Sequence, residues 1–347
     1  ADLATRCLFL PDYFNFLLSG RMVNELSIAS TSQLIDVHSN DWSRATLDYF
    51  RVPPHWFTTP VLAGTRLGRV RGFPELAGTQ VIAVPGHDTA CAYDAMPASP
   101  DGTDLYISAG TWSLVGFESD TPVLGAGALA ARLSNERIGD GRYRPLTNVI
   151  GLWLLEGTFK DFASRPVTDR QWAALIAAAG KLPSLAGPRG GSQSRRSAKA
   201  PAKGATRRDA LLDVTDPAFA NPISMRAAID AQLKRRKLPR PGSLAGYTRL
   251  ICDSLGRGHA DAMRAFERMT GRRFRRILIV GGGSKNRLLC QATADATGLP
   301  VVSFALEGTA VGNLANQLVA IRAVKDLATF RRHLAAGLKQ TVYAPQK

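Results

Sequence analysis

Short apolar runs that end in polar, glycine-bearing turns mark the middle of the chain. Val81–Val84 and Leu105–Ser108 are two such runs, and their length and flanking turn residues predict buried strands. The first ends in Pro85-Gly86-His87-Asp88-Thr89 and the second in Ala109-Gly110-Thr111-Trp112. Polar side chains at the end of a strand are held in place by the sheet while remaining accessible from the loop.

Apolar positions spaced three and four apart predict helices elsewhere. At the start of the chain this spacing joins Leu3, Cys7, Leu10 and Phe14, which predicts that the sequence opens in a helix. A long apolar stripe predicts a further helix over Ser243–Thr270. Other helices are predicted over residues 89–95, 148–158, 169–179 and 309–324. Residues 58–71 carry Pro and Gly and indicate loop and edge strand.

Near the C-terminus a strand, a glycine-rich turn, a helix and a second strand follow one another. The strands are Ile277–Val280 and Val301–Phe304, and the helix is Arg287–Thr297 with Gly298 as its C-terminal cap. Glycines 281–283 between the first strand and the helix allow a ligand to approach the backbone closely. The N-terminus of the following helix favours an anionic or polar ligand.

Length and composition are those of a globular protein with room for two domains. The chain has 347 residues, of which 45% are hydrophobic and 21% charged. It has neither an apolar run of about 20 residues nor a signal-peptide pattern at its start. The four cysteines are scattered without a CxxC pair, so neither a zinc site nor a disulfide framework is expected and a cytoplasmic location is favoured.

The formal net charge of +16 has two interpretations. Binding of a polyanion is one, since Lys and Arg dominate nucleic-acid affinity. However, much of the charge lies in Gly187–Arg208, which has five Arg, two Lys and no acidic residue, and around the C-terminal end of the helix that closes at Thr270. The first segment is predicted to be a disordered surface insert. No nucleic-acid partner is expected, because aromatic and basic residues do not interleave and no recognition-helix pattern occurs.

Two of the turns offer complementary chemistry. The Asp88 carboxylate could accept a proton as a general base, and the Gly110-Thr111 turn offers backbone N–H groups and a hydroxyl to a phosphate. Together they suggest phosphoryl transfer to a hydroxyl group. The residue types alone leave open that Asp88 only forms a turn or caps a helix.

Five blocks in fixed order resemble the FGGY carbohydrate kinases, most closely those that act on L-rhamnulose. The blocks are PDYFNFLLSG with NELSIASTSQLIDVHSNDWS, GHDTA, YISAGTWSLVGFESDTP, GRYRPLTNVIGLWLLEGT and ILIVGGGSKNRLLCQATADATGLPVV. The resemblance covers nearly the whole chain, apart from roughly Pro183–Arg208. The resemblance implies an α/β, actin-like (ribonuclease H-like) fold of two domains. Residues 1–98 would be the C-terminal part of the sugar-binding domain, and 99–347 the nucleotide-binding domain with a disordered basic insert at about 183–208.

By the same resemblance, the chain is expected to be N-terminally incomplete. Its first block matches a part of the family that lies well inside the first domain. The part expected before it includes a Gly/Thr-rich loop that holds the phosphates of ATP. A chain without this loop is expected to be catalytically inactive, because several donors share the charge of the transferred phosphoryl group.

The resemblance also implies a reaction and its residues. ATP, with Mg²⁺, would phosphorylate a ketose, most like L-rhamnulose at its 1-hydroxyl. Asp88 would be the base, and His87, Asp88, Thr89 and Asn148 would contact the sugar. The expected nucleotide-binding residues are Gly110, Thr111, Glu156, Gly282, Gly283 and Asn286. Asn148 could instead, or also, cap the helix predicted after it.

Two positions depart from the family pattern. Glu156 stands where the family typically has Gln, and a carboxylate near phosphates adds repulsion unless Mg²⁺ or a basic side chain compensates. Lys285 stands where Gln is common and adds positive charge nearby. Three interpretations therefore remain open: a kinase of L-rhamnulose, a kinase of L-fuculose or another ketose, and a truncated, inactive binding protein. None involves a membrane.

Overall fold

The computed structural model describes residues 4–185, 210–304 and 307–346, and its packing forms two compact units. Unit 1 comprises Ala1–Gly102, Gly116–Leu146 and Ala305–Lys339, and unit 2 comprises Thr103–Val115, Thr147–Phe304 and Gln340–Lys347. The chain thus passes from one unit to the other five times, at 102/103, 115/116, 146/147, 304/305 and 339/340. The first passage follows a turn at residues 99–102, in which the backbone N–H of Gly102 donates to the carbonyl of Ser99 at 3.4 Å. The division of the family domains at 98/99 stays a prediction.

A mixed β-sheet forms the centre of unit 2. Its strands β6, β4, β3, β7, β8 and β9 are neighbours in that order. β7 runs parallel to β3 and β8, and β9 closes the edge antiparallel to β8. The strands are β3 (Asp104–Ala109), β4 (Trp112–Gly116), β6 (Tyr143–Ile150), β7 (Arg276–Val280), β8 (Val301–Phe304) and β9 (Gln340–Tyr343). β3, β7 and β8 are buried almost throughout, as expected for parallel strands covered on both faces.

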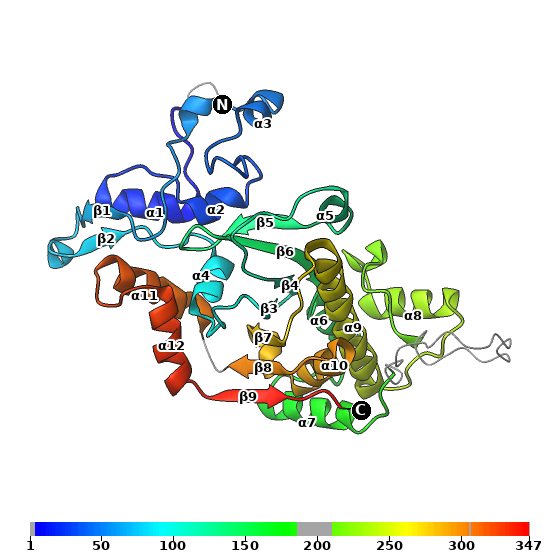
Figure 1. Cartoon of the computed structure of the whole chain (residues 1–347). Coiled ribbons are helices and arrows are strands. Elements are labelled where there is room, and N and C mark those ends of the chain that lie inside the picture. The colour runs from blue at the N-terminus through cyan, green and yellow to red at the C-terminus, as the bar shows by residue number, and fades with distance from the viewer. Residues whose placement is uncertain (1–3, 186–209, 305–306, 347) are drawn as a thin grey trace. The chain divides into compact units, whose positions relative to one another are not determined.

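Helices of unit 2 pack around one hydrophobic core. They are α6 (Trp153–Lys160), α7 (Asp169–Gly180), η4 (Pro217–Phe219), α8 (Met225–Arg235), α9 (Leu244–Thr270), η5 (Gly282–Lys285) and α10 (Arg287–Thr297). The long helix α9 packs against α10, α7 and α6 (Figure 1). Core side chains come from α6, α8, α9 and α10, with Leu155, Ile229, Leu255 and Leu289 all fully enclosed. The core fixes α7, α9 and α10 relative to one another.

Unit 1 contains a small antiparallel sheet, a hairpin and several helices. β1 (Arg66–Arg69) pairs with β2 (Gln80–Ile82), and β5 (Ser134–Arg137) pairs with the first half of β6. The helices are α1 (Leu10–Ser19), α2 (Leu26–Ser30), α3 (Arg44–Tyr49), η1 (Pro54–Trp56), η2 (Pro74–Leu76), α4 (Asp88–Ala95), α5 (Ala126–Ala130), α11 (Gly308–Ala320) and α12 (Leu327–Gly337).

Helices α4 and α11 approach each other closely within unit 1. A Cβ added at Gly312 of α11 would lie 1.8 Å from the carbonyl oxygen of Cys91 in α4. At Gly308 the added atom would lie 3.2 Å from Cβ of Ala92. Only glycine permits this separation of the two backbones. The contact fixes α4, the helix that begins at Asp88.

Two sequence predictions of helices were wrong at their first residues. The first helix begins at Leu10 and not at the start of the chain, because the ring of Pro11 would clash with the carbonyl of Cys7 if the helix extended back. The helix predicted from 148 begins at Trp153. The N–H groups of Gly151 and Leu152 instead donate to the carbonyls of Thr111 and Gly110.

Other predictions agree with the described residues. The strands at 81–84, 105–108, 277–280 and 301–304, and the helices at 89–95, 169–179, 243–270, 287–297 and 309–324, all have counterparts. The predicted disordered insert lies outside the described residues from position 186 onward. Within the described ranges, no helix combines the length and apolar character that crossing a membrane requires.

Candidate functional site

Asp88 is an accessible carboxylate at the start of a helix. It follows β2 by a short turn and is the first residue of α4, where the helix dipole favours negative charge. Its side chain is 74% exposed. Oδ1 accepts a hydrogen bond from the backbone N–H of Thr89 at 2.6 Å and lies 3.2 Å from the Thr89 hydroxyl. One oxygen is therefore oriented by the chain, and the group remains open to a ligand.

A buried acid holds the turn that leads to Asp88. The carboxylate of Glu25, which is almost fully buried, accepts the backbone N–H groups of Gly86 at 2.8 Å and Ser27 at 2.9 Å. Burial raises the pKa of Glu25, and these hydrogen bonds oppose that rise. The backbone N–H of Glu25 itself donates to Asp12 at 3.1 Å. Residues from α1 and α2 thus position the turn of residues 85–89.

His87 lies between Asp88 and a buried ion pair. Its Nε2 is 3.4 Å from Oδ1 of Asp88, and its Nδ1 is 3.3 Å from Oε2 of Glu136. Arg144, which is fully buried, pairs with Glu136 and contacts Nδ1 of His87. Burial would raise the pKa of Glu136, but the hydrogen bond to His87 and the charge of Arg144 hold this pKa below its ordinary value. The hairpin of β5 and β6 therefore orients the imidazole.

Sequence reasoning did not identify Glu136 and Arg144. They face each other as partners across the β5–β6 hairpin, a pairing that no local spacing shows. The sequence signal that could have identified them is a pair of opposite charges at buried positions of two neighbouring strands.

Asn148 does not cap a helix. It lies in β6 with an exposed side chain, in the part of that strand that belongs to unit 2. The helix-cap interpretation was therefore wrong, because β6 continues two residues beyond Asn148. His87, Asp88 and Thr89 belong to unit 1. A sugar contact of Asn148 stays a prediction.

The Gly110-Thr111 turn joins β3 to β4 in unit 2. Its two carbonyls accept hydrogen bonds from Leu152 at 2.9 Å and Gly151 at 3.1 Å. A Cβ at Gly151 would lie 2.6 Å from the Gly110 oxygen, so only glycine fits there. Thr111 is exposed, and across residues 4–185, 210–304 and 307–346 nothing hydrogen-bonds its hydroxyl. This hydroxyl is available to a ligand.

The three glycines after β7 have different roles. Added Cβ atoms at Gly281 and Gly283 would lie 2.7 and 2.6 Å from Ala109, at the end of β3. These two glycines therefore allow the loop to pack beside the Gly110-Thr111 turn, and Gly281 also has a φ of 83°. Nothing lies within 4 Å of a Cβ at Gly282. Of the three, Gly282 is the one that faces open space.

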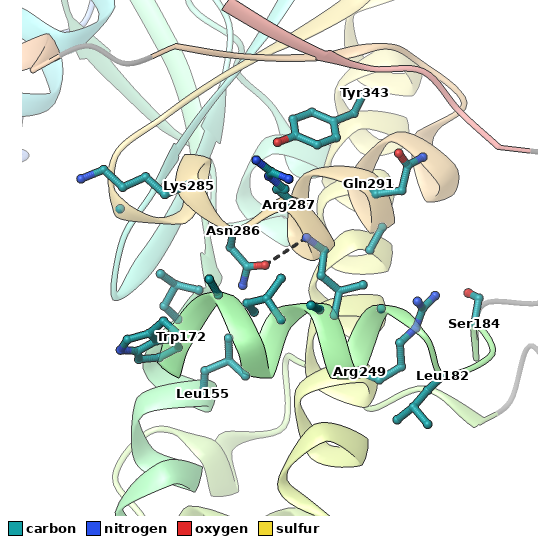
Figure 2. Close-up of a pocket in the computed structure, with 18 of the residues that line it drawn as sticks. Leu155, Trp172, Leu182, Ser184, Arg249, Lys285, Asn286, Arg287, Gln291 and Tyr343 are labelled. Atoms are coloured by element: carbon teal, nitrogen blue, oxygen red, sulfur yellow. Dashed lines mark hydrogen bonds between the residues drawn. The ribbon is translucent and has the colours of Figure 1, made fainter. Parts of the chain in front are cut away.

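A cavity of about 1060 Å³ lies in unit 2 between α7 and α10 (Figure 2). Its volume is at the upper end of small-molecule sites, which span about 300–1,000 Å³. One face of α7 lines it, with Asp169, Trp172, Ala173, Ile176, Ala177 and Gly180. Glu156, Gly282 and Asn286 line it as well. The structure thus brings three of the predicted nucleotide-binding residues to one cavity.

The other predicted nucleotide-binding residues border this region without lining it. Gly283 is buried behind the loop, and the Gly110-Thr111 turn is bonded to Leu152, which is itself part of the lining. Trp172 packs against Phe159, with ring centroids 5.0 Å apart, and also lines the cavity.

The side chain of Asn286 has a structural function. Its Oδ1 accepts the backbone N–H groups of Leu288 and Leu289 at 3.1 and 3.2 Å and so caps α10. Its Nδ2 donates to Sγ of Cys252 at 3.7 Å. Burial raises the pKa of the Cys252 thiol to about 12, so this acceptor is a neutral thiol. Asn286 is therefore held rigidly at the cavity wall.

Charges of both signs share the cavity. Glu156 lines it together with Lys285 and Arg287, so basic side chains accompany the carboxylate that departs from the family pattern. In Figure 2, the Lys285 side chain extends away from the α7–α10 groove. Across the described ranges, no group of three or more His, Cys, Asp or Glu side chains is arranged to hold a metal ion.

Comparison with known proteins gives a consistent result. The profile of the FGGY family of carbohydrate kinases, C-terminal domain, matches residues 105–321. The chain is 36% identical over 339 residues to a rhamnulokinase of Pectobacterium carotovorum subsp. carotovorum (strain PC1), and 35% identical over 342 residues to one of Klebsiella pneumoniae (strain 342). These alignments cover 98% and 99% of this chain but 62% and 64% of the relatives. The chain therefore spans less than two thirds of their length.

Solved structures share the fold at low identity. A ligand-bound xylulose kinase from Lactobacillus acidophilus gives a TM-score of 0.71 at 15% identity, over 99% of this chain and 64% of that one. A glycerol kinase from Plasmodium falciparum with ADP gives 0.69 at 12% identity, over 96% and 62%. These similarities confirm the predicted α/β, actin-like sugar kinase fold.

Proposed function

Because the chain belongs to the FGGY family of carbohydrate kinases, we propose that it acts in the ATP-dependent phosphorylation of a ketose. L-Rhamnulose is the proposed acceptor, at its 1-hydroxyl. The similarity to two rhamnulokinases at 35–36% identity supports this choice. The observation that carries the proposal is the cavity of unit 2, in which Glu156, Gly282 and Asn286 come together beside the Gly110-Thr111 turn.

In this proposal the cavity of unit 2 binds the nucleoside part of ATP. Gly282 allows the backbone to approach the ligand, and the apolar face of α7 with Trp172 receives the base. The free hydroxyl of Thr111 and the backbone N–H groups of its turn suit the phosphates. Mg²⁺ would arrive with ATP, since this ion usually keeps several waters and binds through phosphates with one or two carboxylates. Of the acidic residues that line the cavity, Glu156 is the nearest in sequence to the Gly110-Thr111 turn, and its carboxylate would be the one available to this ion.

Asp88 is the proposed general base. Its exposed carboxylate would accept the proton of the sugar hydroxyl as the oxygen attacks the γ-phosphorus. The bond to the ADP oxygen then breaks, and ADP leaves with that electron pair. His87, oriented by Glu136, lies beside Asp88 and would contact the sugar together with Thr89. A carboxylate on a rigid helix terminus needs little rearrangement to act.

Two measurements test the proposal separately. Tryptophan fluorescence of the protein should change on titration with ADP, because Trp172 faces the cavity. Coupled ADP release should be measured with L-rhamnulose, L-fuculose and D-xylulose and Mg²⁺ on a form of the protein that includes the Gly/Thr-rich phosphate loop expected from the family resemblance. It should give the highest kcat/KM for L-rhamnulose. Absence of ADP binding would overturn the nucleotide site. A higher kcat/KM for another ketose would overturn the acceptor, and ADP binding without turnover on any ketose would favour a non-catalytic binding protein.

A further inference from the structure

The short helix α2 is bonded to two distant segments of unit 1. The carboxylate of Glu25, which caps the start of α2, accepts the backbone N–H of Gly86 at 2.8 Å, in the turn that leads to Asp88. At the other end of α2, the hydroxyl of Ser30 accepts the backbone N–H of Arg137 in β5 at 3.0 Å. These partners lie 61 and 107 residues apart in sequence. Helix α2 therefore connects the turn before Asp88 with strand β5.

Ser27, in the first turn of α2, links these two contacts. It is completely buried. Its hydroxyl donates to Oε2 of Glu25 at 2.6 Å and lies 3.5 Å from the backbone nitrogen of His87, which can donate to it. The carbonyl of Ser27 accepts the hydroxyl of Ser30 at 2.7 Å. Two consecutive backbone N–H groups, those of Gly86 and His87, therefore both face α2.

Glu25 does more than a helix cap requires. Ser, Thr, Asp and Asn are the usual caps, and capping α2 needs only the backbone N–H groups of Ser27 and Ile28, which Glu25 accepts at 2.9 and 3.2 Å. Glu25 is 1% exposed, and among residues 4–185, 210–304 and 307–346 it forms no ion pair. Burying a carboxylate without a cation costs free energy unless hydrogen bonds compensate. The longer side chain of Glu lets Oε2 bond to Gly86 as well, so this residue serves the turn in addition to the helix.

The turn also packs directly against α2. A Cβ added at Gly86 would lie 2.8 Å from Cγ2 of Ile28 in α2 and 3.3 Å from Cβ of Pro11 in α1. Glycine therefore allows the turn to lie against both helices. Asp88 follows two residues later as the first residue of α4. A displacement of α2 would be transmitted to Asp88 through this short stretch of backbone.

We propose that α2 sets the position of the base relative to the strand that orients His87, with Glu25, Ser27 and Ser30 as positioning residues. This inference rests on the proposed role of Asp88. A reacting group must be held within about 0.5 Å of its productive geometry, and a displacement of about 1 Å can lower the rate by about 10²-fold. Helix α2 meets this requirement through the backbone on both sides, at the turn before Asp88 and at β5.

Amide hydrogen exchange, followed by NMR on the chain itself, tests the contacts. The carboxylate of Glu25 accepts donors from Ser27, Ile28 and Gly86, whereas a Gln side chain has a single oxygen. Protection of the Gly86 amide should therefore fall by roughly 10- to 100-fold in Glu25→Gln, the usual value of one hydrogen bond to a charged group. The amide of Ile279 in β7 should keep its protection. Equal protection of Gly86 in parent and variant would overturn the inference.

Kinetics of a second variant, Ser27→Ala, keep the test decisive if Glu25→Gln unfolds. In a form of the protein that includes the Gly/Thr-rich phosphate loop expected from the family resemblance, Ser27→Ala should lower kcat by roughly 10- to 100-fold. The KM for ATP should stay within threefold, because the residues that line the nucleotide cavity belong to unit 2. An unchanged kcat, or a KM that rises as much as kcat falls, would overturn the inference.

Ser32→Ala is the matched control. The Ser32 hydroxyl donates to the carbonyl of Ala29 at 2.6 Å, as that of Ser30 does to Ser27, but in the described part of the chain it bonds neither to the turn before Asp88 nor to β5. It should leave kcat unchanged, and an equal loss in Ser32→Ala and Ser27→Ala would overturn the inference. Full turnover of Asp88→Asn in the same form would refute the proposed base and this positioning role with it. The exchange of Gly86 is measured without turnover, so the two failures are distinguishable.

Discussion

Nε2 of His87 lies 3.4 Å from Oδ1 of Asp88, while Asp88 remains largely exposed and His87 is mostly enclosed. The imidazole thus connects a solvent-accessible carboxylate to the interior of unit 1, where Glu136 and Arg144 form a buried pair. An accessible acid with a fixed neighbour is the arrangement that a general base requires.

In a form of the protein that includes the Gly/Thr-rich phosphate loop expected from the family resemblance, Asp88→Asn should lower the turnover of sugar by about 10²–10⁴-fold, the usual effect of losing a general base. The amide keeps the size of the side chain but cannot accept the proton. ADP binding should be unchanged, because every residue that lines the nucleotide cavity belongs to unit 2. Steady-state kinetics with L-rhamnulose and an ADP titration check both parts. Turnover within threefold of the parent would remove Asp88 from the mechanism.

Glu136→Gln should destabilise unit 1 by about 3–5 kcal/mol, because it leaves the fully buried Arg144 without its anionic partner. Urea denaturation measures the loss. Asp48→Asn is the control, since the Arg44–Asp48 pair has side chains 73% and 57% exposed and should contribute less than about 1 kcal/mol. Equal effects of the two substitutions would show that the Glu136 pair is not buried.

Gly312→Ala should destabilise unit 1 by about 1–3 kcal/mol or more, because its Cβ would overlap the backbone of Cys91 and force α4 and α11 apart. Gly337→Ala near the end of α12 is the matched control, since nothing lies within 4 Å of its added Cβ. Thermal denaturation of both variants gives the comparison. We expect the melting temperature to fall only for Gly312→Ala, and an unchanged value for it would contradict the close packing of the two helices.

His259 should make the protein less stable in acid. Burial lowers the pKa of His259 from 6.5 to about 4. As the pH falls, His259 becomes protonated near pH 6.5 in the unfolded chain but only near pH 4 in the folded protein. The free energy of unfolding therefore decreases as the pH falls from 6.5 to 4, and His259 does not change it above pH 6.5. A shift of this size corresponds to about 3 kcal/mol.

Urea titrations at pH 7, 5.5 and 4.5 check this prediction against His259→Gln. The two proteins share every other titratable group, so the difference between their pH profiles isolates His259. The variant should lose less stability on acidification than the parent, even if it is weaker at pH 7 because Nδ1 of His259 lies 2.9 Å from the Thr293 hydroxyl. Parallel profiles would argue against the lowered pKa.

Local signals account for what the sequence predicted correctly. β2 with its turn, the β3–β4 turn and the β7–loop–α10–β8 unit each consist of an apolar run next to glycine or a helix cap. These signals also carried the family resemblance. Glu156 lies far from Gly282 and Asn286 in sequence. The family resemblance assigned all three to the nucleotide, and they do line one cavity.

What sequence reasoning missed depends on contacts between distant segments. Glu25 looks like an ordinary polar position near the start of a helix, and only the fold shows that it is buried and bonded to Gly86. Glu136 and Arg144 meet through strand pairing. The start of α6 was misplaced because the backbone N–H groups of Gly151 and Leu152 donate to the Gly110-Thr111 turn, about 40 residues earlier. Helix propensity within a short window takes no account of such hydrogen bonds to a distant segment.

The five passages of the chain between the units bear on how the protein is synthesised. Unit 1 requires Ala305–Lys339, and the edge strand β9 of unit 2 is translated after that segment. Neither unit can complete its packing on the ribosome before residues 339–343 have left the exit tunnel. At about 5–20 residues per second, roughly 10–50 s pass between the synthesis of β3 and that of β9, and the apolar strand β3 lacks some of its cover during this time. Chaperones that bind exposed apolar segments would act during this interval, and its length would grow wherever translation is slow.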